Sequence, residues 1–327
     1  MISAQVADNW DVCRFLWGKS FKNRIRHELK GKVQFLRTLV SVDAKKKAVF
    51  FTVLAGFLWG TSFPAIKIGL QYIDVYTFVF LRFLIASLTM LSVMLITKNS
   101  RFSFNKKRLI LFLGLINGVA YLLQYVGMVC TLAVVSSLYI NLSVVWVALL
   151  SPIALKERLG GKKVAGVLVS LLGVVLMTTN LDFASLGTVD IMGNFLVISA
   201  GIIWAVFIIY NKPLVGESDN LIQSMTWILL FTMLPLLPTA AFSAGNFVSL
   251  PWDAWLAIIY TAVLCWVVPY YLWLKGLKHI SPVTSAVVLL TEIIVAVAIS
   301  TIVLGEALTI VSGIGSILII IAILLVS

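Results

Sequence analysis

The amino-acid sequence predicts an all-α integral membrane protein, with ten transmembrane helices arranged as two inverted five-helix repeats. The first observation behind this prediction is composition: of 327 residues, 61% are hydrophobic and 12% are charged. Soluble proteins carry about 25% charged residues. The second observation is a series of apolar segments long enough to cross a bilayer, and the third is a repeat that relates the two halves of the chain.

Ten apolar segments each approach the ~20 residues that a helix needs to cross ~30 Å of hydrocarbon. They lie at about 48–70, 76–97, 108–130, 133–154, 163–180, 190–211, 221–242, 252–274, 282–304 and 308–326. The connections between them are short, so we expect neighbouring spans to run in opposite directions.

The loop charges fix an orientation. If the first span starts in the cytoplasm, all twelve Lys and Arg residues of the connecting loops lie on the cytoplasmic side, and the opposite loops contain none. This bias is typical of multi-spanning proteins and places both termini in the cytoplasm of a cell-membrane protein. The net charge of +12 is therefore explained by basic loop residues that orient the protein in the membrane. The predicted partner is a lipid bilayer, and no nucleic acid is predicted to bind. The twelve residues are Lys98, Arg101, Lys106, Lys107, Arg108, Lys156, Arg158, Lys162, Lys163, Lys212, Lys275 and Lys278.

Residues 1–47 form a separate basic leader on the cytoplasmic side. The stretch FKNRIRHELKGKVQFL places Phe21, Ile25, Leu29 and Val33 at four-residue spacing among basic residues. Such spacing favours an amphipathic helix at the membrane surface. A poorly ordered leader is the alternative, and the sequence leaves both open. The stretch lacks the apolar core and cleavage site of a signal peptide.

The rest of the chain divides into two related domains, 48–180 and 190–327. Aligning Glu157 with Glu306, an offset of 149 residues, also pairs Ser136 with Ser285 and Gly166 with Gly315. A second match, with an offset of 145, pairs LWGTSFPAIKIGL (58–70) with IWAVFIIYNKPLV (203–215). Because each half has an odd number of spans, the second half must enter the membrane from the opposite side. Inverted repeats of this kind are typical of secondary transporters.

Several motifs make the chain resemble the drug/metabolite transporter superfamily, and within it the EamA-type permeases. They are FLWGTSFPAIK in the first span, VFLRFLIAS in the second, the pair ALKERL and VLGEAL after spans four and nine, and PYYLWLKGLKHISPVTSA across spans eight and nine. The resemblance covers residues 48–327. It implies alternating-access transport of amino acids, other metabolites or drugs, generally without ATP.

Glu292 and Arg82 are the first candidates for a substrate site. An ionisable side chain near the bilayer centre is costly and is commonly functional. The helical rise of 1.5 Å per residue places Glu292 ~15 Å from the inner end of its span, near the midplane, and Arg82 ~9 Å from the outer end of its span. Glu292 would bind a substrate amine or carry a coupling proton, and Arg82 could be its counter-ion. The alternatives are a packing role for Glu292 and, for Arg82, a structural role in which it snorkels outward or pairs with Asp74.

Five further residues complete the predicted substrate site. Trp59 and Trp204 are repeat-related tryptophans near the midplane, where an interfacial aromatic belt does not account for them. Asn117 and Tyr121 lie in the third span, and Ser285 lies in the ninth. Each has a packing role as its alternative; Asn117 in particular could join two helices by a hydrogen bond.

These observations predict a secondary transporter of small amphipathic metabolites, such as an amino-acid or drug exporter. No cofactor or metal is predicted. Cys13, Cys130 and Cys265 lack metal-ligand spacing, and neither of the two histidines, His27 and His279, has a potential metal ligand nearby in the sequence. An organophosphate or nucleotide-sugar carrier is the alternative, followed by an intramembrane enzyme and a channel. The substrate, the direction of flux, proton coupling and a homodimer are left open.

Overall fold

The computed structural model describes residues 43–98, 106–131, 133–182, 191–217, 220–242, 250–305 and 308–327, and these residues are helical apart from short connections. The predicted leader helix and Glu306 lie outside the described residues. The first helical segment of the second unit, 48–60, leads into α2. The helices that follow are α2 (Ser62–Gly69), α3 (Val75–Ile96), α4 (Lys107–Cys130), α5 (Ala133–Asn141), α6 (Ser143–Leu155), α7 (Gly161–Thr179), α8 (Ile191–Glu217), α9 (Leu221–Phe242), α10 (Trp252–Ala262), the π-helix η4 (Val263–Val267), α11 (Val268–Leu277), α12 (Pro282–Leu289), α13 (Thr291–Leu304) and α14 (Ile310–Val326).

The chain divides into two compact units, Met1–Lys47 and Ala48–Ser327. In the described part of the chain, nine helical spans are long and apolar enough to cross a membrane, and α14 is a shorter apolar helix. These ten segments follow the predicted spans closely. The protein is therefore a multi-pass, all-helical membrane protein.

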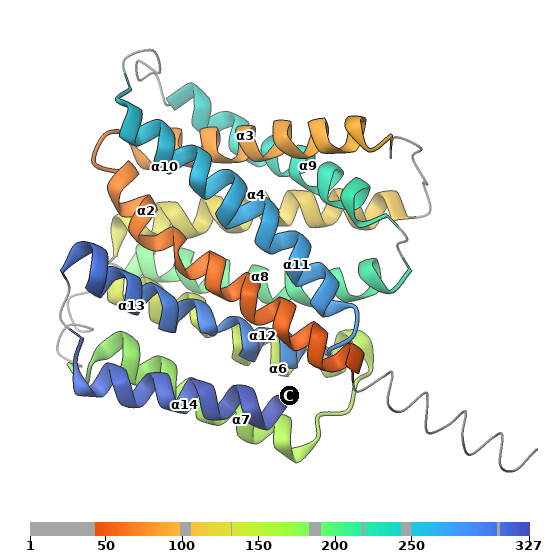
Figure 1. Ribbon diagram of the computed structural model, residues 1–327, viewed down its shortest axis with the longest axis vertical. Coiled ribbons are helices and arrows are strands. Elements are labelled where there is room, and N and C mark those ends of the chain that lie inside the picture. Colours follow the sequence, from red (N-terminus) through yellow and green to blue (C-terminus); the bar gives the residue numbers. More distant parts are fainter. Residues whose placement is uncertain are drawn as a thin grey trace, which may run out of the picture. The chain divides into compact units, whose positions relative to one another are not determined.

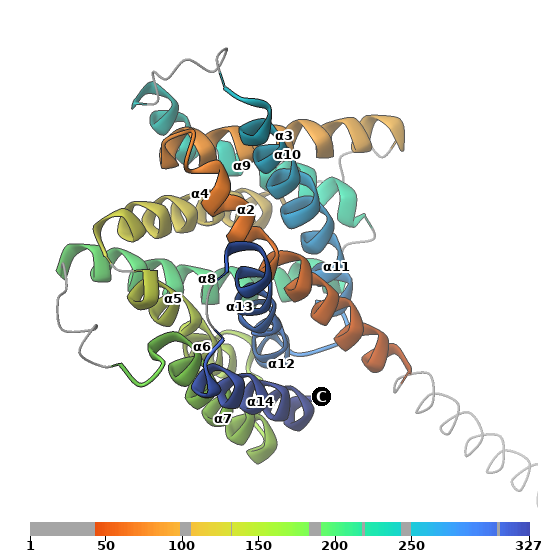
Figure 2. The same ribbon diagram turned by 60° about the vertical axis from the view of Figure 1, so that its left-hand side comes forward.

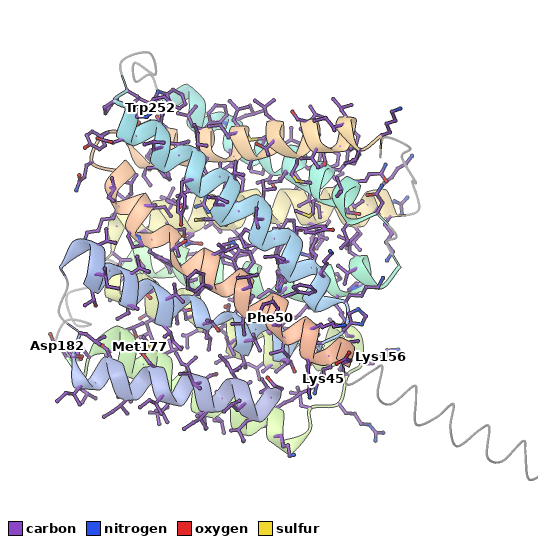
Figure 3. All side chains as sticks on the ribbon, in the orientation of Figure 1. Lys45, Phe50, Lys156, Met177, Asp182 and Trp252 are labelled. Atoms are coloured by element: carbon purple, nitrogen blue, oxygen red, sulfur yellow. The ribbon has the colours of Figure 1, made fainter. Side chains whose placement is uncertain are left out.

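The loop predicted to be basic and two loops predicted to lack basic residues lie at opposite ends of the helices. Figure 3 shows Lys156 at one end of the helices and Asp182 and Trp252 at the opposite end. Lys156 belongs to a loop predicted to be cytoplasmic, whereas the other two residues flank loops predicted to lie outside. Two boundaries differ from the sequence prediction in ways that move a basic residue from a loop into a helix: α8 continues past residue 211 to Glu217 and contains Lys212, and α11 continues past residue 274 to Leu277 and contains Lys275.

Lys212 joins α8 to the connection between α11 and α12. Its ammonium group donates to the carbonyl oxygens of Leu277 at 2.8 Å, Lys278 at 3.1 Å and Ile280 at 2.8 Å. The last carbonyls of a helix lack partners within the helix, and a cation is favourable beside them. Lys212 thus stabilises the C-terminal end of α11.

Spans four and nine each have a one-residue interruption in their α-helical hydrogen bonding, and each otherwise continues as one helical span, Val135–Leu155 and Pro282–Val303. The fourth consists of α5 and α6, which meet at Leu142, and the ninth consists of α12 and α13, which meet at Leu290. An offset of 149 residues brings these two positions within one residue of each other. The sequence did not predict these interruptions, because no Gly or Pro lies at either position. Pro64 and Pro269, the prolines of spans one and eight, lie near the starts of α2 and α11.

Glycines set the close approach of the helices, and the same contacts recur in both halves. A β-carbon at Gly127 would lie 2.9 Å from the carbonyl oxygen of Gly193, and one at Gly276 would lie 2.7 Å from that of Ala48. Offsets of 149 and 145 relate the members of these two contacts. Small residues at such positions allow helix backbones to approach closely in a membrane.

A second pair of contacts places the first and sixth spans against the interrupted spans. A β-carbon at Gly56 would lie 3.2 Å from the carbonyl oxygen of Leu289, just before the interruption in span nine. One at Gly201 would lie 3.6 Å from the carbonyl oxygen of Ile140, just before the interruption in span four. These contacts are also related by the two offsets.

The helices α7 and α14 form a third such contact and lie side by side in Figures 1 and 2. A β-carbon at Gly173 would lie 2.8 Å from the carbonyl oxygen of Gly315, and a β-carbon at Gly315 would lie 2.8 Å from that of Gly173. The last span of each half is therefore held against its counterpart.

Candidate functional site

A cluster of aromatic side chains fills the space between spans two, three, six and eight. At its centre is Tyr121 of α4, whose ring centroid lies 4.5 Å from Phe83 and 4.8 Å from Trp204. Its hydroxyl accepts a hydrogen bond of 2.8 Å from the indole nitrogen of Trp266 in η4. The structure thus brings together two residues of the predicted site, Tyr121 and Trp204.

The cluster continues toward spans one and nine. The ring of Phe207 lies 5.6 Å from Trp204 and 6.1 Å from Trp273, and the latter contact is stacked. Trp273 in turn lies 6.1 Å from Trp59 and stacks on Tyr270 at 5.7 Å. Trp59 and Trp204, which the sequence selected as repeat-related tryptophans, therefore lie at two places in one continuous aromatic cluster.

Arg82 lies at one edge of this cluster and is 3% exposed. Its guanidinium carbon lies 5.8 Å from the Tyr121 ring centroid, and its Nη1 donates to the Tyr125 hydroxyl at 3.3 Å. Its Nη2 lies 3.5 Å from the carbonyl oxygen of Cys265, within the π-helix η4. Short π-helical segments are frequent at functional sites.

The Arg82 charge has no acidic partner within the described part of the chain, and its buried Nε has no hydrogen-bond partner. The suggested pair with Asp74 is wrong, because Asp74 instead caps α3: its carboxylate accepts from the backbone of Tyr76 and Thr77, both at 3.0 Å. A buried, unpaired guanidinium is costly, so it favours an anionic ligand.

Glu292 lies in the first turn of α13, directly after the interruption in span nine. Its side chain is half-buried, and among the described residues no group forms an ion pair or hydrogen bond with the carboxylate. The predicted ion pair with Arg82 is therefore absent in this structure. A β-carbon at Gly60 would lie 2.5 Å from the Glu292 carbonyl oxygen, so span one packs closely on this turn beside Trp59.

The remaining predicted residues divide between two places. Ser285 is fully buried and accepts a hydrogen bond of 2.7 Å from the indole of Trp273, so it contacts the cluster. Asn117 is also fully buried, but it donates to Thr232 of α9 at 2.9 Å, and its side-chain oxygen has no partner. Asn117 therefore joins α4 to α9, as the packing alternative describes.

Sequence reasoning missed most of the aromatic cluster. Trp273, Tyr270 and Phe207 were not selected, and Gln124, whose side-chain oxygen accepts from Trp204 at 2.9 Å, was not selected either. The repeat contains a signal that could have found two of them: an offset of 149 relates Tyr270 to Tyr121 and Trp273 to Gln124. Within the described residues, no three His, Cys, Asp or Glu side chains are grouped so as to hold a metal ion.

Comparison with known proteins assigns the family. The model of the EamA-like transporter family matches residues 46–179 and again residues 191–327. The chain belongs to the EamA-like transporter family. The protein is therefore a transporter and not an enzyme.

Relatives within this family are named as transporters. A protein of Archaeoglobus fulgidus named "Uncharacterized transporter" is 29% identical over 74% of this chain and 83% of its own length. A protein of Escherichia coli named "Probable amino-acid metabolite efflux pump" is 24% identical over 84% of this chain and 92% of its own length. A solved structure, 16% identical, covers 86% of this chain and 96% of its own with a TM-score of 0.72, which indicates a shared fold.

Proposed function

We propose that this EamA-family protein is a secondary transporter that exports small amphipathic metabolites, of the amino-acid or drug type, by alternating access. One observation carries the proposal: the buried Arg82 guanidinium lies beside the Tyr121 ring of the aromatic cluster, and the turn that carries Glu292 packs on Gly60, the neighbour of Trp59 in the chain. A zwitterion with an apolar side chain matches these groups, because it offers an amine, a carboxylate and an apolar surface.

The site residues have distinct roles in this proposal. Glu292 binds the substrate amine or carries a coupling proton, and Arg82 binds a carboxylate. Trp59, Tyr121 and Trp204 contact the apolar part of the substrate, a role that aromatic faces suit. The two remaining residues position this surface: Ser285 holds Trp273, and Asn117 holds α4 against α9.

We also propose that ten spans form two inverted repeats, 48–180 and 190–327, with the site between them. The recurrence of the glycine contacts at offsets of 145 and 149 residues supports this arrangement. Alternating access then requires the substrate to contact the two conformations differently.

An amino-acid type of substrate is favoured over a phosphorylated one. The Escherichia coli and Salmonella typhimurium relatives named as probable amino-acid metabolite efflux pumps support this choice. A phosphate group is best held by several Arg or Lys side chains. Among the described residues, Arg82 is the one fully buried basic side chain, so the organophosphate alternative has little support.

The proposed location is the cell membrane, with both termini cytoplasmic. Two cysteine substitutions at exposed positions test this orientation in a chain freed of its own cysteines. Gln71→Cys, after α2, is expected to react with an impermeant thiol reagent in intact cells, and Gly160→Cys is expected to react only after lysis. The reverse pattern would exclude the orientation.

Transport is tested with purified protein in proteoliposomes. Uptake of radiolabelled L-leucine and L-phenylalanine should saturate, and preloading with the unlabelled compound should accelerate it by exchange. Flux that rises without saturation would indicate a channel instead, and a complete lack of uptake of either amino acid would refute the amino-acid class. Imposing a pH gradient tests proton coupling, and light scattering of the detergent-solubilised protein tests for a homodimer.

A further inference from the structure

The two halves place different side chains at corresponding positions of the same helical hairpin. In the second half, the indole of Trp273 in α11 donates to Ser285 in α12 at 2.7 Å and lies 6.1 Å from Trp59. The offsets relate these three residues to Gln124, Ser136 and Trp204 of the first half. The hairpin that carries Gln124 and Ser136 packs as its counterpart does, as the contacts at Gly127 and Gly276 show.

Replacing the indole by a shorter amide changes the hydrogen bonds of the first half. The Gln124 side-chain oxygen accepts from the Trp204 indole at 2.9 Å, and its NH2 group donates to no described residue. Ser136 is 1% exposed, and its hydroxyl has no hydrogen-bond partner. In the second half, by contrast, the corresponding Ser285 hydroxyl accepts from Trp273.

The buried Ser136 hydroxyl is thus without a partner, whereas the corresponding Ser285 hydroxyl is satisfied by the indole that replaces the partly exposed Gln124 in the second half. A buried polar group without a partner destabilises a protein, and natural structures leave few such groups. The Ser136 hydroxyl and the Gln124 NH2 group can each donate a hydrogen bond. A ligand that satisfies both groups is an acceptor oxygen.

We infer that Gln124 and Ser136 form a polar subsite for a carboxylate or carboxamide oxygen of the transported substrate. This inference rests on the proposed transport function and adds a direction to the site. The acceptor group binds at the Gln124 side, where Arg82 approaches Tyr121, and the apolar part binds at the Trp273 side. The corresponding position in the second half is closed by Trp273.

The existence of the subsite can be tested without a substrate. In a variant whose three cysteines are replaced, Ser136→Cys and Ser285→Cys are compared for their rate of reaction with N-ethylmaleimide in purified protein. Cys at 136 should react at least tenfold faster, because Trp273 covers position 285. Equal rates, or faster reaction at 285, would overturn the inference.

Exchanging the two hairpin residues provides the matched control. Gln124→Trp should slow the reaction at position 136, since it adds the missing indole, and Trp273→Gln should speed the reaction at position 285. Melting temperatures report whether each variant folds. If an exchange variant does not fold, the comparison of the cysteines at positions 136 and 285 still tests the subsite. If Gln124→Trp folds and the cysteine at position 136 still reacts at an unchanged rate, the result would count against the subsite.

The ligand chemistry is tested by protection of the cysteine at position 136. L-Leucine and L-phenylalanine should slow its modification at least fivefold, whereas 3-methylbutylamine and 2-phenylethylamine, which lack the carboxylate, should not. Equal protection by acids and amines would overturn the carboxylate assignment, as would no protection by an amino acid that the wild-type protein transports. If wild type transports neither amino acid, the proposed function fails, and the reaction rates at 136 and 285 still decide whether the subsite exists.

Discussion

The two halves of this transporter share their backbone packing and differ in the side chains of the site. Gly127 meets Gly193 in one half as Gly276 meets Ala48 in the other. At the interrupted spans, however, Ser143 of the first half corresponds to Glu292 of the second. Close backbone contacts constrain both halves alike, whereas the side chains of the central cluster are free to diverge. The differences between corresponding positions therefore indicate where specificity lies.

The largest expected effect concerns Gly60, where the two halves are not equivalent. Its counterpart is Ala205, which already carries a β-carbon and is fully buried. At Gly60 a β-carbon would lie 2.5 Å from the Glu292 carbonyl oxygen and 2.7 Å from the β-carbon of Val295. Backbone atoms cannot move aside as a flexible side chain can, so Gly60→Ala should abolish the folded protein or lower its melting temperature severely.

Gly160→Ala is the matched control, since no atom lies within 4 Å of its added β-carbon. Yield on size-exclusion chromatography and the melting temperature measure both variants. Wild-type stability of Gly60→Ala would show that span one can shift away from α13, and would weaken the argument that this contact positions Glu292.

The second prediction separates Glu292 from its counterpart Ser143. Glu292→Gln keeps shape and hydrogen-bonding capacity but removes the charge. Uptake into proteoliposomes should therefore fall at least tenfold, and a tenfold fall corresponds to a loss of about 1.4 kcal/mol in the interaction between protein and substrate. The melting temperature should change little, because the carboxylate has no partner among the described residues. Ser143→Ala should leave uptake within about twofold of wild type. Unchanged uptake by Glu292→Gln at every pH would make Glu292 a structural residue.

The sequence alone predicted the spans, because hydrophobic length is a local property of the chain, and the inverted repeat that it also indicated stays a proposal. Glu292 and Arg82 were found for a similar reason: a charge inside an apolar segment is visible without a structure. Trp273 and Phe207 were missed because a buried aromatic residue in an apolar helix gives no signal of the direction in which it points. The interruptions at Leu142 and Leu290 depend on packing against other spans and have no local marker.

The third prediction compares Trp59 with Trp204, which occupy corresponding positions with different partners. Trp59 makes a ring contact with Trp273, while Trp204 also donates a hydrogen bond to Gln124. Alanine at either position should weaken substrate binding about tenfold, since each removes a large apolar face. Trp204→Ala should be the less stable of the two, because it leaves the Gln124 oxygen without its donor.

Thermal unfolding and substrate-dependent tryptophan fluorescence measure these two effects. Trp252→Ala is the control for loss of a tryptophan, because Trp252 is 72% exposed at a helix end. If both cluster variants bind substrate like wild type, the aromatic cluster is packing and the proposed substrate surface is wrong.

The last prediction concerns stability alone, at Lys212, the counterpart of Lys67 by the 145-residue offset. Its ammonium group donates to the carbonyl oxygens of Leu277, Lys278 and Ile280. Lys212→Met keeps most of the apolar stem but leaves these carbonyls without their donor, so the free energy of unfolding should fall by about 1–3 kcal/mol. Lys278→Met, at an exposed position, should change it by less than about 0.5 kcal/mol. Equal melting temperatures for the two variants would mean that water or a neighbouring group replaces the ammonium, and that the α11–α12 connection does not depend on Lys212.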